Sequence, residues 1–473
     1  MTPTVPDWVK DAVFYQVFPD RFATSARLEK PGNLEPWGSP PTVHGYKGGD
    51  LLGVAERLDH VQALGANALY LNPVFASTAN HRYHTHDYHR VDPLLGGDAA
   101  LEELLDAAHA RGMRVILDGV FNHASRGFLQ FNDVLENGEK SPYLDWFHVK
   151  RLPLNAYGGG PLGYEAWWGL PALPKLNVAN PQVREFLLDV GERWLRFGAD
   201  GWRLDVPSEI DDDEFWREFR RRCVAAKPDA YIVGEIWELA ERWLQGDMFH
   251  GVMNYPFARA VYGLVGRDVD QAEAAKSGLG TIEPLEPAAF AARLDDLLKV
   301  YPGETAFGQL NLLGSHDTPR LATVLRGDDV AVRQALLLLF ASPGAPCVYY
   351  GDEIGLRGGH DPGNRGTVPW ADRAAWDEDL LAFVSALGGL RRELEPLRRG
   401  TAEVFAVAGA VVIRRESAAG VVCAAVNATD HAVDLRGRAL PATAFVDRLD
   451  PRAAPGEGSF TLPYRSYAVL TPA

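Results

Sequence analysis

The stretch GWRLDV at residues 201–206 is a short apolar run that ends in an acid, Asp205. Three other stretches have the same form: RVILDGVFNH at 114–123, YIVGEIW at 231–237 and LNLLGSHDT at 310–318. Such a run is typical of a parallel strand covered on both faces, and α/β barrels carry their chemistry at the carboxyl ends of these strands. The sequence therefore predicts that Asp205, Glu235 and Asp317 meet in one catalytic site.

Each acid taken alone allows another interpretation, because an acid after a strand can also cap the next helix or pair with an arginine. Four segments of one form are harder to explain in that way. Together they favour one shared site over separate structural roles.

Eight apolar runs predict β-strands, and eight parallel strands are the number that closes a TIM barrel, (β/α)8. The runs are 12–18, 68–71, 114–118, 201–205, 231–235, 251–253, 310–313 and 346–350. Helical patterns between them cover 101–111, 183–197 and 330–340, and Gly112 and Gly198 stand where helices would stop. This alternation predicts the α/β fold class.

Two stretches depart from the alternation. Residues 124–180 are rich in Gly, Pro and aromatic residues, which predicts an insertion after the third barrel strand. From about residue 396 the pattern becomes short alternating runs with turn signals, typical of a small antiparallel β-sandwich. The predicted domains are a catalytic barrel over 1–123 and 181–395, an inserted domain over 124–180 and a C-terminal β-sandwich over 396–473.

The composition is that of a folded, acidic protein of 473 residues with a formal net charge of −16. This charge disfavours nucleic acid and anionic membranes as partners and favours a neutral substrate. No apolar run approaches the roughly 18 residues that a membrane helix needs. The chain begins without a signal-peptide pattern and its 3 cysteines lie far apart, so we expect a cytoplasmic protein without disulfides or a cysteine-ligated metal.

At the motifs quoted above, the chain resembles the α-amylase superfamily of retaining glycoside hydrolases. DGVFNH, GWRLD, GEIW and SHDT are similar to four characteristic segments of that superfamily and follow the same order. GGDLLGV at 48–54 and GDEIGL at 351–356 are similar to two flanking segments, and the resemblance runs from about residue 13 to the end. It implies the barrel fold and chemistry at glycosidic bonds.

The resemblance implies a role for each of the three acids. Asp205 would be the nucleophile that forms a covalent glycosyl-enzyme, and Glu235 would protonate the leaving oxygen and then activate water, so that the anomeric configuration is retained. Asp317, with His316 and His123, would grip the hydroxyls of the distorted sugar and so bind the transition state.

Other residues are similar to the sugar-binding positions of the superfamily. His81 and Tyr83 would contact the same sugar, with Tyr83 as an aromatic platform. Asp361 and Arg365 would hold the next sugar on the non-reducing side, with a plain loop ion pair as the alternative. His84 departs from the pattern, since most relatives carry Asp at that position.

Arg203 lies two residues before Asp205, so both side chains point to the same face of one strand. We expect the arginine to hold Asp205 ionised, with an ordinary barrel salt bridge as the alternative. Asp87 is expected to be a structural partner of the buried Arg203.

Within the superfamily, LPKLN at 173–177 and VMNYPF at 252–257 resemble the neopullulanase, cyclomaltodextrinase and maltogenic amylase group. Members of that group usually carry an additional amino-terminal β domain that forms dimers, whereas this chain reaches its first predicted strand at residue 12. The resemblance therefore leaves the oligomeric state of this chain open. Three tryptophans are expected either to stack on outer glucose rings or to pack inside the protein: Trp167, Trp168 and Trp237.

Many α-amylases hold a calcium ion between the barrel and the insertion. Asn122 matches one of its ligands, but Lys175 stands where such enzymes place an Asp, and Glu209 where they place a His. An ammonium group there would repel a dication. We expect this interdomain calcium to be absent and no other cofactor to be needed, while a calcium ion elsewhere is not excluded.

The resulting expectation is retaining hydrolysis of α-1,4-glucosidic bonds in malto-oligosaccharides or cyclodextrins, with possible transglycosylation. Alternatives are a glucosyl transferase or isomerase acting on trehalose or sucrose, and an α-1,6 or exo-acting glucosidase of the same superfamily. A member that only binds sugar is disfavoured, because Asp205, Glu235 and Asp317 are all present.

Overall fold

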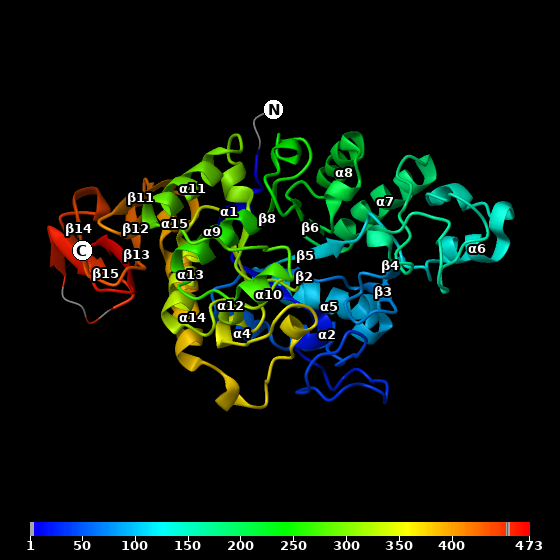
Figure 1. The fold of residues 1–473 in the computed structure, drawn as a ribbon, viewed down its shortest axis with the longest axis horizontal. Helices are drawn as coiled ribbons and strands as arrows, with labels where there is room; N and C mark the ends of the chain where they lie inside the picture. Colours follow the sequence, from blue (N-terminus) through cyan, green and yellow to red (C-terminus); the bar gives the residue numbers. More distant parts are fainter. Residues whose placement is uncertain (1–3, 451, 453–454) are drawn as a thin grey trace.

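The computed structural model describes residues 4–450, 452 and 455–473. Eight parallel strands form a closed barrel in the order β1-β10-β9-β8-β7-β6-β5-β2 (Figure 1). These strands are β1 (Phe14–Val17), β2 (Ala68–Leu71), β5 (Arg114–Gly119), β6 (Gly201–Leu204), β7 (Tyr231–Gly234), β8 (Gly251–Asn254), β9 (Leu310–Leu312) and β10 (Ala345–Tyr349). All eight predicted strands are present, and the predicted TIM barrel is confirmed.

The barrel strands are buried on both faces. Every residue of β1, β2, β6 and β7 is buried, which explains why these strands have continuous apolar sequences. The strands also approach closely at Gly201, where a Cβ atom would come within 2.1 Å of the Tyr231 carbonyl oxygen. A glycine is therefore required at the start of β6.

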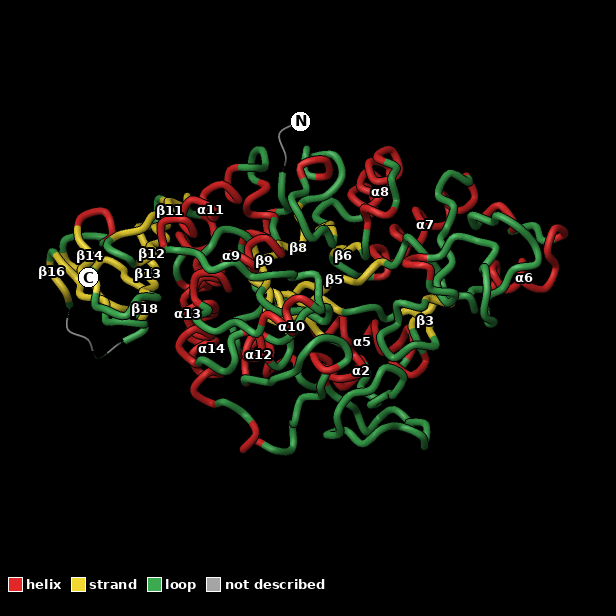
Figure 2. The backbone as a smooth tube through the Cα atoms, viewed as in Figure 1, coloured by secondary structure: helices red, strands yellow, loops and turns green. Residues whose placement is uncertain are grey.

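Helices surround the barrel strands, apart from α6 (Leu129–Asn137), which lies away from the barrel (Figure 2). They are α1 (Asp7–Lys10), α2 (Pro19–Phe22), α3 (Leu51–Ala55), α4 (Leu58–Ala63), α5 (Gly97–Ala110), α6 (Leu129–Asn137), α7 (Pro181–Phe197), α8 (Asp213–Ala226), α9 (Tyr255–Val265), α10 (Gln271–Ala275), α11 (Pro287–Lys299), α12 (Leu321–Val324), α13 (Asp329–Ala341), α14 (Glu378–Glu393) and α15 (Glu395–Arg399). The three predicted helical patterns correspond to α5, α7 and α13. Gly112 and Gly198 end α5 and α7 with positive φ angles of 71° and 137°, as expected of helix stops.

Between β5 and α7 the chain forms an excursion over residues 120–180, which carries α6 and lies to one side of the barrel in Figure 1. Within it, pairing consists of single bridges such as His123 with Lys175 and Phe147 with Leu176. A hairpin of β3 (Phe75–Ser77) and β4 (Thr85–Val91) precedes it and was not predicted.

The C-terminal domain lies on the opposite side of the barrel from the excursion (Figure 1). Its strands are β11 (Thr401–Val407), β12 (Ala410–Ser417), β13 (Gly420–Asn427), β14 (Val433–Arg436), β15 (Ala444–Asp447), β16 (Gly456–Glu457), β17 (Ser459–Leu462) and β18 (Ser466–Pro472). A 6-stranded antiparallel sheet and the 2-stranded sheet β14-β17 enclose a second hydrophobic core. The predicted antiparallel β domain is confirmed.

Two buried arginines link this domain to the barrel. Arg415, on β12, donates to the carbonyl oxygens of Ala341 and Leu397, both at 2.8 Å. Arg391, on α14, donates to the carbonyl oxygens of Phe340 at 2.7 Å and Leu397 at 3.0 Å. Phe340 and Ala341 end α13, so the guanidinium groups lie at the negative end of that helix. Among the described helices, none is long and apolar enough to cross a membrane.

Candidate active site

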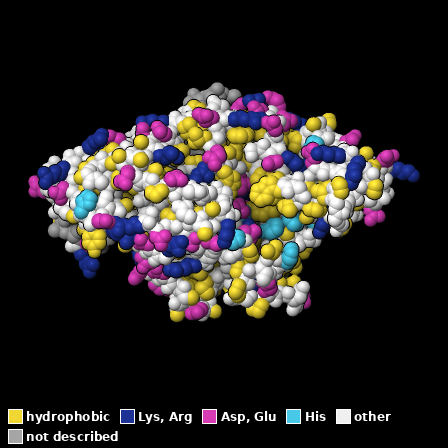
Figure 3. Space-filling view, in the orientation of Figure 1, with side chains coloured by type: hydrophobic (Ala, Val, Ile, Leu, Met, Phe, Trp, Pro, Cys, Tyr) yellow, Lys and Arg dark blue, Asp and Glu magenta, His cyan; other side chains and the backbone are white. Residues whose placement is uncertain are grey.

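Asp205, Glu235 and Asp317 follow β6, β7 and β9 at one mouth of the barrel, where they line a cavity of about 790 Å³. Nine of the ten predicted site residues line it: His81, Tyr83, His123, Asp205, Glu235, His316, Asp317, Asp361 and Arg365. The tenth, Arg203, lies buried beneath them. Figure 3 shows hydrophobic and histidine side chains gathered about a hollow between the barrel and the excursion.

The fully buried guanidinium of Arg203 lies at the centre of the carboxylates. Its Nη1 is 2.8 Å from Asp118 Oδ1 and 3.1 Å from Asp205 Oδ1. Its Nη2 is 3.1 Å from Glu235 Oε2 and 4.0 Å from Asp317 Oδ2. One cation therefore holds carboxylates from several strand ends together, and the expected contact between Arg203 and Asp205 is present.

Burial and the neighbouring carboxyls oppose the effect that Arg203 has on the pKa of Asp205. Burial raises the pKa of Asp205 well above its usual range, the Arg203 charge opposes this, and the Glu235 charge adds to it. Burial, followed by the Glu235 charge, likewise raises the pKa of Asp317 to about 7. Because interacting carboxyls titrate as a group, this cluster retains a proton towards neutral pH.

Asp118, and not Asp87, is the structural partner of Arg203, so the expectation for Asp87 was wrong. Asp87 lies on β4 and accepts a hydrogen bond from the backbone of His89 at 2.8 Å. Asp118 lies within β5 and also accepts hydrogen bonds from Tyr70 at 2.7 Å and Tyr83 at 2.8 Å. The signal was available, since Asp118 is the acid of the fourth strand-end segment.

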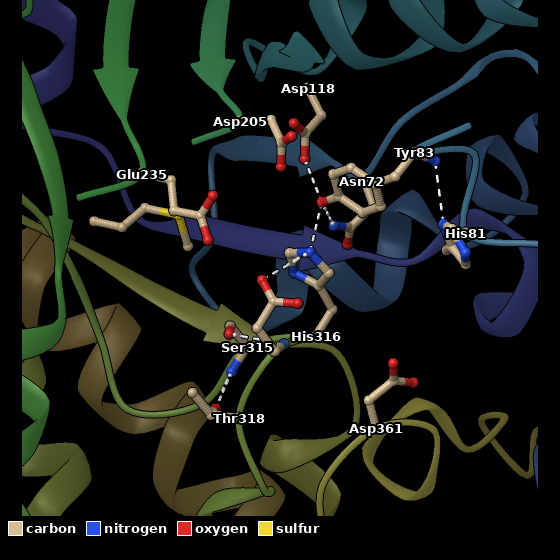
Figure 4. Close-up of polar contacts among 12 residues, drawn as sticks. Asn72, His81, Tyr83, Asp118, Asp205, Glu235, Ser315, His316, Thr318 and Asp361 are labelled. Atoms are coloured by element: carbon tan, nitrogen blue, oxygen red, sulfur yellow. Dashed lines mark hydrogen bonds and ion pairs between the residues drawn. The ribbon is translucent and has the colours of Figure 1, made fainter. Parts of the chain in front are cut away.

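A chain of hydrogen bonds fixes Tyr83 and His316 (Figure 4). Gln16, on β1, donates its Nε2 to His316 Nδ1 at 2.9 Å and to Asn72 Oδ1 at 3.1 Å, and Asn72 donates to the Tyr83 hydroxyl at 3.0 Å. Since His316 Nδ1 accepts, its Nε2 carries the hydrogen and faces Asp317 Oδ2 at 3.1 Å. Gln16 and Asn72 were not predicted, because a single amide beside a strand-like run carries no signal of its own.

The pocket histidines are neutral hydrogen-bonding groups. Burial lowers the pKa of His123 to about 3 and holds that of His81 well below its usual range. Asn122 Nδ2 donates to His123 Nδ1 at 3.2 Å, which leaves Nε2 as a donor without a protein partner among the described groups. His123 can therefore donate to a sugar hydroxyl.

Asp361 and Arg365 form an ion pair at 3.1 Å at the rim of the cavity. The guanidinium of Arg365 also lies 3.4 Å from Asp317 Oδ1 and donates to the His316 carbonyl at 3.0 Å. The pair is thus part of the site and joins the rim to the carboxylate cluster.

Aromatic rings form the walls of the cavity. Trp167 stacks between His123, at a centroid distance of 5.3 Å, and Trp168, at 4.5 Å, and Trp168 is 80% exposed. Trp237 stacks on Tyr255 at 3.6 Å. All three tryptophans line the cavity. The loop residues Lys276, Ser277 and Gly278 also line it and were not predicted, because no motif marks them.

The residues at the junction of the barrel and the excursion do not fit a calcium ion. Lys175 Nζ lies 2.9 Å from Glu209 Oε2 and 3.3 Å from the Glu209 carbonyl oxygen. That ammonium group already contacts the backbone oxygen that would bind a dication.

TIM-barrel enzymes have their active sites at this mouth of the barrel, and most glycoside hydrolases act through a pair of carboxyl groups. The site has the groups that this class of enzyme needs. The family model described as "Alpha amylase, catalytic domain" matches residues 16–387. The chain belongs to the α-amylase family.

Similar proteins and solved structures support this assignment. A cyclomaltodextrinase of a Bacillus species is 47% identical over 398 residues, which cover 84% of this chain and 68% of that protein. A solved structure from Thermus thermophilus is 52% identical, with a TM-score of 0.92, and covers 98% of this chain and 100% of its own. The Nostoc punctiforme debranching enzyme is 44% identical, with a TM-score of 0.90, and covers 100% of both chains.

Proposed function

We propose that this protein hydrolyses α-1,4-glucosidic bonds in malto-oligosaccharides and cyclodextrins with retention of anomeric configuration. The observation that carries the proposal is that Asp205 and Glu235, from neighbouring strands, contact Nη1 and Nη2 of one guanidinium, each at 3.1 Å. Retaining enzymes need two carboxyls only about 5–5.5 Å apart, so that one attacks the sugar directly. Sharing one guanidinium favours that short separation.

In the first step, the Asp205 carboxylate attacks the anomeric carbon while Glu235 gives its proton to the oxygen of the leaving sugar. The bond to that oxygen breaks, and a glycosyl ester on Asp205 forms. In the second step, Glu235 takes a proton from water, and the resulting attack releases the sugar and frees Asp205. An acceptor sugar in place of water would give transglycosylation.

The remaining groups bind the sugar as it distorts. Asp317 and the Nε2 donor of His123 would bind hydroxyls of the reacting glucose, and His316 would hold Asp317 in place. The ring of Tyr83 stacks on His316 with an interplanar angle of 3° and offers a rigid platform. Asp361 and Arg365, at the rim, would bind the next glucose.

A second candidate is cleavage of α-1,6 bonds, which the similarity to the Nostoc punctiforme debranching enzyme favours. Parallel incubation with maltotriose, a cyclodextrin, pullulan, isomaltose and trehalose distinguishes the candidates. Glucose and maltose from maltotriose, and ring opening of the cyclodextrin, support the first candidate. Cleavage confined to isomaltose and pullulan would replace it with the second, and rearrangement of trehalose without hydrolysis would contradict both.

We also propose that the reaction needs no calcium ion between the barrel and the excursion, since Lys175 contacts Glu209 there. Three buried free cysteines, Cys223, Cys347 and Cys423, suit a reducing compartment such as the cytoplasm.

A further inference from the structure

The two carboxylate oxygens of Glu235 are held by different donors. Oε2 accepts the Val206 backbone N–H at 3.0 Å and lies 3.1 Å from Nη2 of Arg203. Oε1 accepts the indole N–H of Trp237 at 3.1 Å. Since Oε2 faces an N–H and a cation together, a proton on that oxygen is strongly disfavoured. The proton of Glu235 therefore belongs on Oε1.

We propose that Trp237 is a positioning residue for the reaction, whose indole N–H orients Oε1 of Glu235, the oxygen that gives and takes the proton. This inference rests on the proposed function, because it assumes that Glu235 is the general acid and base. It gives Trp237 a task beyond stacking on a sugar.

The indole ring is fixed from several sides. One face lies on Tyr255, with 3.6 Å between ring centroids and an interplanar angle of 7°. A Cβ atom at Gly278 would come within 2.4 Å of the six-membered ring, so the loop packs there only because it has a glycine. Arg259 donates to the Trp237 carbonyl at 2.8 Å. A ring held in this way keeps its N–H directed at Glu235, and the face on Tyr255 is not free to stack on a sugar.

The backbone of Val206, which donates to Glu235 Oε2, is strained. Val206 follows the nucleophile directly and has φ 35° and ψ 51°, in the left-handed region that a β-branched residue rarely adopts. Such a conformation is strained, and strained residues of this kind are common at functional sites. The strained turn directs the Val206 N–H at Glu235 Oε2. The carboxyl of Glu235 therefore accepts one hydrogen bond from the loop after Asp205 and one from Trp237 in its own loop.

The electrostatic effect of the indole can be separated from that of its neighbours. The charged or titratable groups that face Glu235 are Arg203, Asp205, Asp317 and Tyr255. None of them changes when Trp237 loses its N–H. A hydrogen bond to a carboxyl stabilises the ionised form more than the neutral form. Removing it therefore moves the alkaline limb of the kcat/KM profile to higher pH.

The decisive variant is Trp237→Phe, which keeps an aromatic ring on Tyr255 but has no N–H. We expect kcat/KM on maltotriose to fall about 3- to 10-fold, and the alkaline limb to rise by about 0.5–1 pH unit. On α-maltosyl fluoride, whose leaving group needs little protonation, the loss should be smaller. Trp167→Phe is the matched control, because Trp167 lies in the same cavity between His123 and Trp168, and should leave the limb in place.

Gly278→Ala provides a second variant, because its methyl group displaces the indole while leaving Trp237 unchanged, and it should shift the limb in the same direction. A wild-type alkaline limb in a Trp237→Phe protein with wild-type thermal stability overturns the inference. If Trp237→Phe does not fold, an unshifted limb in Gly278→Ala overturns it instead. Failure of the wild-type protein to cleave any glucan would refute the proposed function itself, which is a distinguishable result.

Discussion

Among single residues, the site depends on acids whose burial lowers the stability of the fold. Asp118, Asp205 and Glu235 are buried around Arg203, so their charges lie close together and only partly compensated. The structure keeps these carboxyls where the reaction needs them at the expense of stability. Function and stability therefore oppose each other at these positions.

Asp205→Asn tests the nucleophile. An amide cannot form the glycosyl ester, so kcat on maltotriose should fall by at least about 10⁴-fold, as losses of nucleophiles elsewhere do. Initial-rate measurement with product chromatography checks this. Asp211→Asn, at a side chain that is 80% exposed, is the control and should keep its activity. Comparable turnover in Asp205→Asn would exclude this nucleophile.

Asp317→Asn tests the conflict between function and stability. Because burial raises the pKa of Asp317 to about 7, folding favours its neutral form. Ionisation of this carboxyl destabilises the folded protein. The effect is absent below the pKa of Asp in the unfolded chain, near 4, grows as pH rises, and is complete above the folded pKa of about 7. The variant should therefore unfold at a higher temperature than wild type at pH 8. We expect its free energy of unfolding to be larger by about 1–2 kcal/mol, a modest gain because the Asp317 side chain is 30% exposed and solvent screens its charge.

Thermal unfolding followed by circular dichroism at pH 5 and pH 8 measures this gain, which should shrink at pH 5. Asp59→Asn, at a side chain that is 85% exposed, should show no such dependence. An equal gain at both pH values would contradict the raised pKa of Asp317.

For helices and strands, the sequence predicts an element when its pattern depends on the residues of that element alone. The barrel strands were predictable because burial on both faces makes each a continuous apolar run. The β3–β4 hairpin was not: in β4 the buried residues are Thr85, Tyr88 and Val91, three apart, since bulges shift its register. A strand without alternation of period two gives no strand pattern.

The same distinction applies to the site. Asp205, Glu235 and Asp317 were predictable because each follows its own apolar strand within a few residues. Gln16 and Gly278 were not, because their importance comes from His316 and Trp237, which are distant in sequence. Contacts of that kind exist only once the barrel has closed.

The junction between barrel and excursion leads to a prediction about metal dependence. Because the Lys175 ammonium contacts both the carboxylate and the carbonyl of Glu209, dialysis against EDTA should change neither activity nor thermal stability. Assays before and after dialysis, with and without added calcium, check this. Loss of activity that calcium restores would show that the protein depends on a calcium ion.

At the scale of the whole molecule, the C-terminal domain is joined to the barrel through buried cations without carboxylate partners among the described residues. Arg415 is fully buried and donates to the carbonyl oxygens of Ala341, Leu397 and Gly400, and Arg391 shares the Leu397 carbonyl. The bond to Ala341 satisfies a carbonyl group at the end of α13, and the bonds to Leu397 and Gly400 satisfy carbonyl groups at the end of α15, where no further helix turn supplies a donor. The attachment is thus a helix cap supplied by another domain.

Arg415→Met should weaken this attachment without affecting the active site. The carbonyls of Ala341 and Gly400 lose this donor, while that of Leu397 keeps Arg391. Each buried carbonyl left without a donor costs about 1–3 kcal/mol, so the unfolding free energy should fall by several kcal/mol in total. Calorimetry should show the C-terminal domain unfolding at a lower temperature than the barrel. The kcat/KM at 25 °C should stay at the wild-type value, because the carbonyls that Arg415 contacts belong to α13, Leu397 and Gly400, and none of these lines the cavity. Arg436→Met is the control, since that side chain is 71% exposed on β14. A single unshifted transition in Arg415→Met would mean that packing alone joins the two domains.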